Sequence, residues 1–537
     1  MPVTLNADGF YDVLASADSR VVYVSSTTGN NANPGTEALP LQTIAAGYAM
    51  LRSGYPDHLM LRRGDSFAEG TVYWGVSGRS ASEPALMGAY GTGARPVWNT
   101  AGESSIIFGN VSYVYVQSVE ITPGPAGGSG MGRIGACNTI TLEDVYLHHA
   151  QFNLNFDGDE SARPTNIALL RCIVADSAPN PQAGYGSGIL TGWVDGFLCD
   201  SCYFIGNGWG DGSGIRSIFN HNFYIYGQCD RVTIRNTVVA NGSYNGISCN
   251  ATRSVMQNNL VVGNCVGIMV RQNGSVVEDN VVCECEYQTL DSGANESDSR
   301  GINIKRLMGE AIAQQSQHAG AATVRNNLVV GPCVPLDFNA PYFTKSAIVI
   351  ADRDTWNAAC TTEISGNIVY NWEGPCLLVE NRAEDTPTAV TGNTFWANNG
   401  AYGARPIVLV DSDPSHADFT FSGNHHYRSD AGGNWFGGAW GATTYDSWVA
   451  TVGETGSTST APDFTDPGRT VGQYAASIGL VGTRAAFLAA CRAQRRGSWN
   501  TALEANEANT YIRDGFAASG PAPAAFALNP EVHEWLS

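Results

Sequence analysis

Short apolar segments of the form V-x-I-x-x-N recur along the chain, and each is followed by a second segment that often opens with Gly-Ile, as in GSGILTG, YNGISCN, CVGIMV and RGINIK. Alternation of apolar and polar residues with a period of two predicts β-strands. Recurrence at a period of roughly 20–50 residues is typical of solenoid proteins. The aligned repeat positions are Ser118, Asp144, Cys172, Cys202, Asn236, Asn259, Asn280, Asn327, Asn367, Asn393 and Asn424.

A unit of two or three short strands cannot bury a core alone, so successive units must stack with like strands paired in parallel. We therefore predict an all-β fold, a right-handed parallel β-helix. A leucine-rich repeat would need leucines at fixed positions and a nearly constant period, which this chain lacks. Equivalent side chains of successive coils lie about 4.8 Å apart. Asn236, Asn259 and Asn280 are accordingly expected to form a ladder of hydrogen-bonded amides.

The segments outside the repeat suggest caps at both ends of the stack. Residues 22–51 predict a strand, a Gly/Asn/Pro loop and an amphipathic helix, which would cover the first coil. Helical spacing returns near the C-terminus. The predicted division is an N-terminal arm (1–20), an N-terminal cap with the first coils (21–105), the β-helix (106–430) and a small C-terminal helical cap (431–537).

The charge of the chain limits its partners. It carries 29 basic and 49 acidic residues and a net charge of −20, which argues against a nucleic acid partner because phosphate binding needs a basic surface. The opening residues show no basic segment followed by an apolar one, and no apolar run is long enough for a membrane helix, so we expect neither a secretory signal nor membrane insertion.

The chain contains 13 cysteines, and most of those in the repeat fall in strand-like contexts. Buried thiols are the favoured interpretation. Cys199/Cys202 and Cys283/Cys285 lack a matched second pair, so no metal site is predicted from them.

The segment YVSSTTGNNANPGTEALPLQTI (23–44), followed by the repeat, resembles the opening of members of the pectin-lyase-like superfamily of right-handed parallel β-helix proteins. That superfamily includes polysaccharide lyases, glycoside hydrolases, epimerases and phage tailspikes, so the resemblance implies a fold and only a broad class of function. NFDGDE (155–160) supplies carboxylates like those of polygalacturonases, but the Gly-His-Gly motif of that family is absent.

Outward-facing residues of one sheet would line a groove along the coils. If the isoleucine after each Gly points inward, Arg216, Ser248, Asn250, Met269, Arg271, Asn303 and Lys305 point outward. Arg216, Arg271 and Lys305 would then form a basic track that suits a uronate or sulfated glycan. A lyase also needs such charge neutralisation together with a base. The alternative is that these are ordinary solvated or salt-bridged surface residues.

One coil concentrates candidate acid/base groups beside this track. GWGDGSGIRSIFNHNFYIYG (208–227) contains Asp211, Arg216, His221, Tyr224 and Tyr226, of which His221 and Tyr224 are acid/base candidates and the aromatic rings could stack on sugars. His221 could equally cap a turn, and Tyr224 could face a neighbouring strand.

Two acidic segments are further candidates. The long interruption at 286–322 brings Asp298 close to the Gly-Ile strand, and 157–160 is acidic. Carboxylates there could act as a glycosidase pair or bind Ca²⁺, and solvated acidic loops are the alternative. No other cofactor is predicted.

The sequence thus favours a carbohydrate-active protein, leaning towards a polysaccharide lyase or glycoside hydrolase. The leading hypothesis is a phage tailspike or tail fibre, homotrimeric, located on the virion tail with other phage tail proteins, that binds and cleaves an acidic host polysaccharide. The alternatives are a secreted extracellular bacterial lyase or hydrolase and a glycan-binding structural protein without catalysis.

Overall fold

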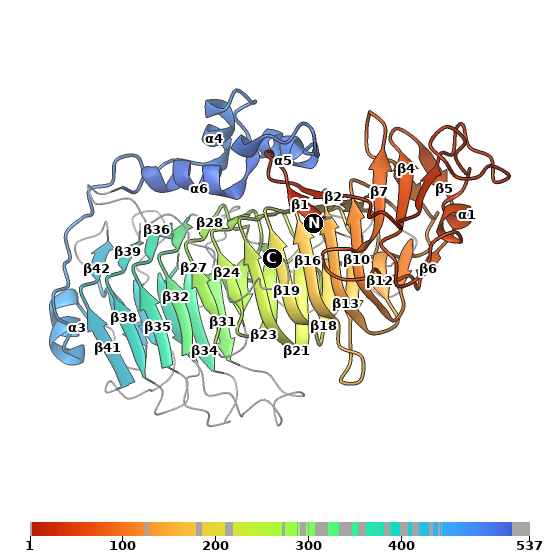
Figure 1. Cartoon of the computed structure of the whole chain (residues 1–537). Helices are drawn as coiled ribbons and strands as arrows, with labels where there is room; N and C mark the ends of the chain where they lie inside the picture. Colours follow the sequence, from red (N-terminus) through yellow and green to blue (C-terminus); the bar gives the residue numbers. More distant parts are fainter. Residues whose placement is uncertain are drawn as a thin grey trace. The chain divides into compact units, whose positions relative to one another are not determined.

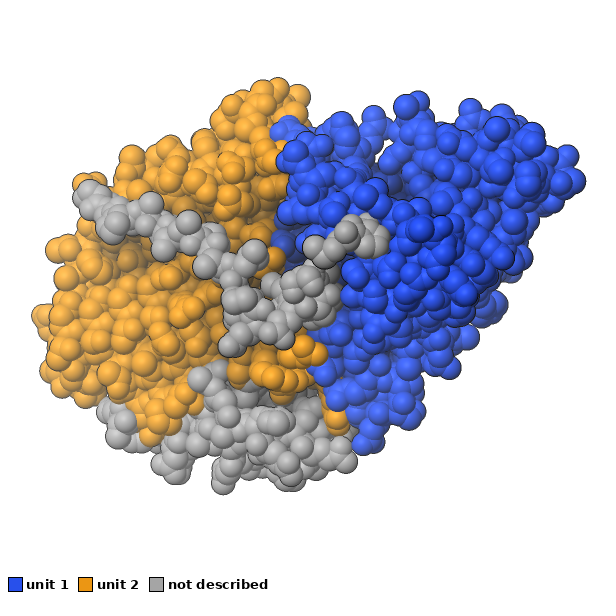
Figure 2. Space-filling model, viewed as in Figure 1, with its two compact units in different colours: residues 1–214, 490–500, 525–537 blue, residues 215–489, 501–524 orange. Residues whose placement is uncertain are grey.

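The computed structural model describes most of the chain in two compact units, which Figure 2 distinguishes by colour. Unit 1 comprises residues 1–214, 490–500 and 525–537, and unit 2 comprises 215–489 and 501–524. The described residues are 3–123, 128–178, 185–209, 219–270, 274–286, 288–289, 297–298, 300–306, 321–331, 346–352, 361–372, 374–380, 387–397, 406–410, 418–428, 433–438, 441 and 443–517.

Each coil of unit 1 contributes up to three strands, and each strand pairs in parallel with its equivalent in the next coil (Figure 1). The first strands are β6 (Val72–Trp74), β9 (Ile106–Phe108), β12 (Ser129–Arg133), β15 (Phe152–Asp157) and β18 (Ser187–Gly192). The second strands are β3 (Val21–Val24), β4 (His58–Arg62), β7 (Ala85–Tyr90), β10 (Val111–Gln117), β13 (Cys137–Glu143), β16 (Thr165–Leu170) and β19 (Asp195–Asp200). The third strands are β5 (Ser66–Ala68), β8 (Val97–Asn99), β11 (Glu120–Ile121), β14 (Tyr146–His148), β17 (Ile173–Ala175) and β20 (Tyr203–Ile205).

Unit 2 repeats the same arrangement, and its long strand β21 (His221–Arg235) supplies both a first and a second strand. The other first strands are β23 (Asn245–Thr252), β26 (Val266–Val270), β31 (Arg300–Arg306), β34 (Ile348–Asp352), β37 (Leu377–Glu380), β40 (Val408–Val410) and β43 (Phe436–Gly438). The other second strands are β24 (Val255–Gln257), β27 (Val276–Glu278), β32 (Ala321–Arg325), β35 (Thr361–Ser365), β38 (Thr388–Thr391) and β41 (Phe419–Ser422). The third strands are β22 (Val238–Ala240), β25 (Leu260–Val262), β28 (Val281–Cys283), β33 (Leu328–Val330), β36 (Ile368–Trp372), β39 (Thr394–Ala397) and β42 (His425–Arg428).

This parallel pairing of like strands confirms the predicted fold class, a parallel β-helix. Its core consists of columns in which each inward side chain lies over its counterpart in the next coil, as Ile247 lies over Ile268. The column of unit 2 whose members have no exposed surface contains Phe223, Ile247, Ile268, Ile348, Leu377 and Val408. The predicted buried thiols are also present, because every described cysteine is buried and unbridged.

A single residue in the left-handed conformation turns the chain from the second to the third strand in most coils. A positive φ is costly for most residues, because their Cβ clashes with the backbone. Gly, which lacks a Cβ, and Asn and Asp tolerate it best, and these three residue types predominate here. The turn column contains Ser118, Asp144, Arg171, Ser201, Asn236, Asn258, Asp279, Asn326, Gly366, Gly392 and Gly423.

A ladder of buried asparagine amides begins immediately after this turn in unit 2. Each Nδ2 donates to the Oδ1 of the next asparagine at 2.9–3.0 Å. It also donates to a carbonyl of the preceding coil, as Asn327 does to the Val277 oxygen at 2.8 Å. The ladder consists of Asn259, Asn280, Asn327, Asn367, Asn393 and Asn424. The predicted ladder is therefore confirmed at Asn259 and Asn280.

The predicted alignment was wrong at Ser118, Asp144 and Asn236, which lie in the turn column, so Asn236 is not part of the ladder. Arg235 pairs with Gln257, so Asn236 is the counterpart of Asn258, and the Asn258 Nδ2 donates to the Asn236 Oδ1 at 2.9 Å. Thr237 occupies the ladder position of that coil, and its backbone N–H donates to the Asn259 Oδ1 at 3.1 Å.

A buried carboxylate ends the ladder. Each Nδ2 of the ladder donates one hydrogen to the asparagine of the next coil, so the last amide, Asn424, needs another acceptor, and it donates to the Glu454 Oε1 at 2.8 Å. Glu454 also accepts from the His426 Nε2 at 3.1 Å and the Trp448 Nε1 at 3.2 Å. Burial opposes the charge of Glu454, but the hydrogen bonds and the charge of His426 outweigh it and lower the pKa of the carboxyl.

In each unit, a helix covers one end of the stacked strands. In unit 1, α1 (Ile44–Tyr48) is capped by Thr43, and a Cβ at Gly47 would collide with Val24 of β3 and Leu59 of β4, so the helix lies directly on these strands. In unit 2, α3 (Tyr445–Val452) stacks Trp448 on Phe436 of the last first strand at 4.3 Å. These helices protect open strand edges.

The remaining C-terminal helices do not lie on the end of unit 2. They are α4 (Val471–Ser477), α5 (Arg484–Arg492), the 3₁₀ helix η4 (Thr501–Leu503) and α6 (Ala505–Asp514). From α6, the Asn509 Nδ2 donates to the Asn258 Oδ1 at 3.0 Å, and Arg513 donates to the carbonyls of Asn280 and Asn326 at 3.0 and 2.8 Å. Helix α6 thus lies beside the turn column, as Figure 1 shows. No helix among the described residues is long and apolar enough to span a bilayer.

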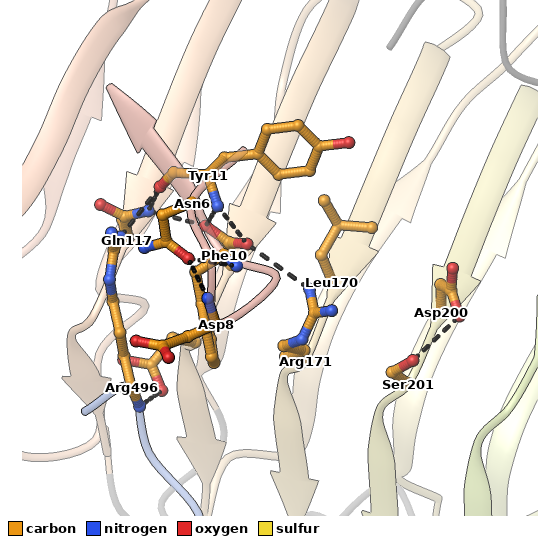
Figure 3. A network of polar contacts seen from close by, with 12 residues as sticks. Asn6, Asp8, Phe10, Tyr11, Gln117, Leu170, Arg171, Asp200, Ser201 and Arg496 are labelled. Atoms are coloured by element: carbon orange, nitrogen blue, oxygen red, sulfur yellow. Dashed lines mark hydrogen bonds and ion pairs between the residues drawn. The ribbon is translucent and has the colours of Figure 1, made fainter. Parts of the chain in front are cut away.

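The first residues of the chain also pack against a turn column. The hairpin of β1 (Val3–Leu5) and β2 (Tyr11–Val13) brings the Tyr11 N–H to the buried Glu143 carboxylate at 3.0 Å. The Tyr11 carbonyl accepts from Gln117 at 2.7 Å and from Arg496 at 2.9 Å (Figure 3). The predicted N-terminal arm is therefore held on unit 1 by its backbone.

Candidate functional site

The outer face of the first-strand sheet in unit 2 is the candidate site. Some of its strands are joined to their neighbours by long connections, at 284–299 before β31, 307–320 after it and 331–347 before β34. Long connections on a rigid scaffold commonly carry function. Large parts of these connections lie outside the described residues, and the described part of the candidate site consists of the strands.

Three aromatic rings line the start of this face on β21. The rings of His221 and Tyr224 lie 4.8 Å apart, and Tyr224 stacks on Tyr226 at 5.4 Å with an interplanar angle of 23°. Tyr244, which the sequence did not single out, extends the group at 6.1 Å from His221. Both β21 tyrosines are partly exposed, whereas His221 is buried. The sequence prediction that His221, Tyr224 and Tyr226 lie together is thus met, with the tyrosines nearest the surface.

A backbone hydrogen bond selects the tautomer that His221 adopts when its ring is neutral. The backbone N–H of Asn245 donates to its Nδ1 at 3.4 Å, so a neutral ring carries its proton on Nε2. A ring held in one tautomer presents the same group, an N–H donor, each time it is neutral. The burial of His221 means that a substrate on the outer face would meet Tyr224 first.

The register places Ser248, Met269 and Asn303 of the predicted column in line next to these rings, with Tyr224 rather than Arg216 as the counterpart of Ser248. Tyr224 pairs with Ser248, Ser248 with Met269, and Met269 with Asn303. Ser248 and Met269 are nevertheless almost completely buried, at 1% and 3% exposure, so they form a floor rather than a contact surface. Asn250, two residues after Ser248, is partly exposed and remains the substrate-binding candidate on β23.

Further along the same column the outer face is apolar. Val349, Leu378 and Leu409 form a cluster that is buried to within 3% exposure. Polar groups that could contact a substrate are therefore concentrated on the coils of β21 and β23 among the described residues.

Several predicted residues cannot be placed by their side chains. Asp211, Arg216 and Arg271 lie outside the described residues. Lys305 and Asn303 are on β31, where Lys305 pairs with Ala351. Asp298 ends the short strand β30 (Ser297–Asp298), which pairs antiparallel with β29 (Gln288–Thr289). The basic track of Arg216, Arg271 and Lys305 stays a prediction.

An ion pair that the sequence did not reveal borders this face where β21 passes from first to second strand. Arg253 donates from Nε to the Asp230 Oδ1 at 2.9 Å, and Thr252 donates to the same oxygen at 2.8 Å. Burial opposes the charge of Asp230, but these hydrogen bonds lower its pKa. Asp230 is therefore ionised and occupied by protein donors, which makes it a structural group rather than a proton donor.

The acidic segment at 157–160 forms a self-capped turn in unit 1. The Asp159 Oδ1 accepts from the backbone N–H groups of Ser161 and Ala162 at 2.8 and 2.9 Å, and hydrogen bonds from Ser161 lower the pKa of this carboxyl. Among the described residues, no three His, Cys, Asp or Glu side chains are grouped so that they could hold a metal ion. Calcium binding stays a prediction.

The chain matches no protein-family model and no curated protein. It is similar in structure to a GH136 lacto-N-biosidase from Eubacterium ramulus, with 16% identity over 82% of this chain and 68% of that one and a TM-score of 0.39. It is also similar to a PL6 alginate lyase in complex with a trisaccharide, with 13% identity, coverage of 84% and 90% and a TM-score of 0.48. The pectate lyase Pel9A shows 14% identity, coverage of 81% and 85% and a TM-score of 0.37.

Proposed function

We propose that the outer face of the first-strand sheet in unit 2 binds an acidic polysaccharide and that the protein cleaves it. The observation that supports this is the row of partly exposed rings of Tyr224 and Tyr226 beside His221. Aromatic faces bind the apolar faces of sugar rings, and the hydroxyl and imidazole groups at their edges can move protons. A rigid sheet would hold these groups in place as one surface.

The groups described at the site favour elimination over hydrolysis. In elimination, a base takes the proton α to the uronate carboxylate, the bond from the β-carbon to the glycosidic oxygen breaks, and that oxygen takes up a proton. We assign the proton transfers to Tyr224, with His221 positioning its ring and Tyr226 and Asn250 contacting the sugar. Hydrolysis needs two carboxylates flanking the scissile bond, and the described carboxylate beside this face, Asp230, is held by Arg253.

A panel of alginate, pectate, ulvan and host capsule tests this proposal. Elimination creates an unsaturated sugar that absorbs ultraviolet light, and hydrolysis creates reducing ends without that absorbance. We expect Tyr224→Phe to reduce the cleavage rate by about 100-fold or more and Tyr226→Ala mainly to raise KM. The control is Tyr55→Phe, at an exposed tyrosine of unit 1 that rests on Arg52. Absence of cleavage on every polymer, or an unchanged rate in Tyr224→Phe, would contradict the proposal.

The biological setting is proposed separately. A phage tailspike or tail fibre, acting as a homotrimer on the virion tail, suits a β-helix that recognises a surface glycan, and a secreted bacterial enzyme is the alternative. Light scattering after size-exclusion chromatography distinguishes a trimer from a monomer. A monomer at micromolar concentration would count against the tailspike setting without affecting the cleavage proposal.

A further inference from the structure

The dipeptide His-His occurs twice in the chain, and the backbone arranges its two rings differently each time. At His425 and His426 in β42, successive side chains alternate between the two faces of the strand, so His425 is exposed and His426 is buried. His148 ends β14, and His149 after it has a φ of +62°, in the left-handed region. That conformation breaks the alternation, and neither His148 nor His149 is buried.

The rings of His148 and His149 face each other through their nitrogens. The two Nδ1 atoms lie 2.5 Å apart, and the ring planes meet at 75° with their centroids 4.7 Å apart. Two nitrogen lone pairs repel each other at such a distance, so a proton or a metal ion must lie between them. The backbone has therefore brought two imidazole nitrogens together at the surface of unit 1.

Glu120 determines which nitrogen of His148 carries a lone pair. The His148 Nε2 lies 3.1 Å from the Glu120 Oε1, and an ionised carboxylate only accepts hydrogen bonds. The Nε2 therefore holds the proton, and a neutral His148 has its lone pair on Nδ1. The ring of Tyr146 packs against that of His148 at 4.3 Å and limits its rotation. Histidines that bind metals usually have this arrangement, with the second ring nitrogen donating to a carboxylate.

The groups around His149 are compatible with a bound cation. Burial and, after it, the charge of His148 lower the pKa of His149, so its ring is neutral at neutral pH, as a metal ligand must be. Since His148 pairs with Ala175, the counterpart of His149 in the next coil is Asp176. The charge of Arg492 acts unfavourably on a cation at His149, but Arg492 pairs with Asp176 at 2.7 Å, and the carboxylate acts favourably.

We propose that His148 and His149 bind one divalent transition-metal ion of the zinc type through their Nδ1 atoms. Metal–nitrogen bonds of about 2.0–2.1 Å, at right or tetrahedral angles, need the two nitrogens about 2.9–3.4 Å apart, so the exposed His149 ring has to move outward by less than about 1 Å. Water would fill the remaining positions, because the described residues offer no group of three His, Cys, Asp or Glu side chains. The site lies on the third strands of unit 1 and is independent of the glycan face proposed for unit 2.

Isothermal titration of the full chain with zinc chloride tests the proposal. We expect a zinc ion to bind with a Kd below about 1 mM. Calcium chloride at the same concentration should not displace it, because calcium takes oxygen ligands and imidazole suits zinc. A parent protein that binds no zinc in this range, or zinc that calcium displaces, would overturn the proposal.

His149→Asn is the decisive variant. Asparagine adopts the left-handed conformation readily, so the turn is kept while one ligand is lost, and we expect zinc binding at this site to disappear. Glu120→Ala should weaken zinc binding about tenfold or more, because the carboxylate orients His148.

The control is His425→Ala, which removes the exposed histidine of the other His-His pair and should leave the zinc titration unchanged. Circular dichroism would confirm that each variant is folded. A folded His149→Asn protein that binds zinc like the parent would refute the assignment, as would a His425→Ala protein that loses the binding.

Discussion

The position after the turn is filled by an amide in unit 2 from Asn259 onwards, and by the thiols of Cys172 and Cys202 in two coils of unit 1. In unit 2, the Asn280 Oδ1 accepts the backbone N–H of Asn259 and its Nδ2 donates to the Met256 carbonyl. In unit 1, the Cys202 sulfur accepts the backbone N–H of Cys172 at 3.3 Å and donates to the Leu169 carbonyl at 3.4 Å. Both side chains thus supply one donor and one acceptor to the backbone of neighbouring coils.

The amide and the thiol differ in the further hydrogen bonds that they can make. An amide has a second donor and a second lone pair, so each asparagine also bonds to the next one, whereas a thiol is a weak donor and acceptor. Burial raises the pKa of the Cys172 and Cys202 thiols well above the ordinary value, so both keep their protons and remain donors. The comparison teaches that an amide and a thiol can make the same two backbone contacts and that the amide ladder gives additional coupling between coils.

Asn327→Leu should break this coupling most strongly. The Asn327 side chain accepts from the backbone and the Nδ2 of Asn280 and donates to Asn367 and to the Val277 carbonyl. Leucine would leave these buried groups unsatisfied, at roughly 1–3 kcal/mol for each, and we expect a total loss on the order of 4 kcal/mol, measured as a lower denaturant midpoint. Asn326→Gly is the control, because later coils carry Gly at that turn position, and a similar loss there would contradict the explanation.

Glu454→Gln should weaken the end of the ladder by about 2 kcal/mol. Three donors, from Asn424, His426 and Trp448, converge on the carboxylate, and an amide offers one acceptor oxygen and turns its own donors towards one of them. Thermal unfolding followed by tryptophan fluorescence would report the change near Trp448. A variant as stable as the parent would show that the ladder needs no anionic end.

The pH dependence of that difference follows from the lowered pKa of Glu454. A carboxyl whose pKa is lower in the folded state stabilises the protein above its unfolded pKa, and this contribution is lost as the pH falls through the folded pKa. The ordinary value is 4.5, so the advantage of the parent over Glu454→Gln should be complete near neutral pH and should shrink below pH 4.5. Parallel stability curves down to pH 3 would count against the assignment.

Cys202→Ala should have the smallest effect, about 1–2 kcal/mol, because it removes one weak donor and a small buried side chain. Cys202→Asn would sharpen the comparison, since an amide at this position could restore both backbone contacts. Circular dichroism at increasing temperature would rank the variants. A loss in Cys202→Ala equal to that of Asn327→Leu would refute the claim that the amide ladder adds coupling.

The repeat pattern was sufficient to predict the architecture, because the alternating apolar residues of V-x-I-x-x-N indicate a strand and the asparagine indicates the turn that follows it. It was insufficient at Asn236, since a turn position and a ladder position both favour asparagine, and QNNLVV places one of each side by side as Asn258 and Asn259. Backbone register was needed to separate them.

For the candidate site, the sequence predicted which residues share a column but not which of them are exposed. Alternation identified which residues share the outward column, and the pairing of Ser248 with Met269 agrees. It could not tell that both are buried while Asn250 is partly exposed, because exposure depends on neighbours distant in sequence.

The contacts of α6 with the turn column affect how the protein unfolds and how it folds during synthesis. Asn509 and Arg513 bind the turns of three successive coils, so a terminal coil of this set cannot peel away while the helix stays bound. Stacked repeats interact mainly with their nearest neighbours and can unfold coil by coil. A helix bound across several coils makes their unfolding cooperative. Because α6 is synthesised after all the coils that it contacts, a chain released early from the ribosome would contain these coils without the helix that joins them.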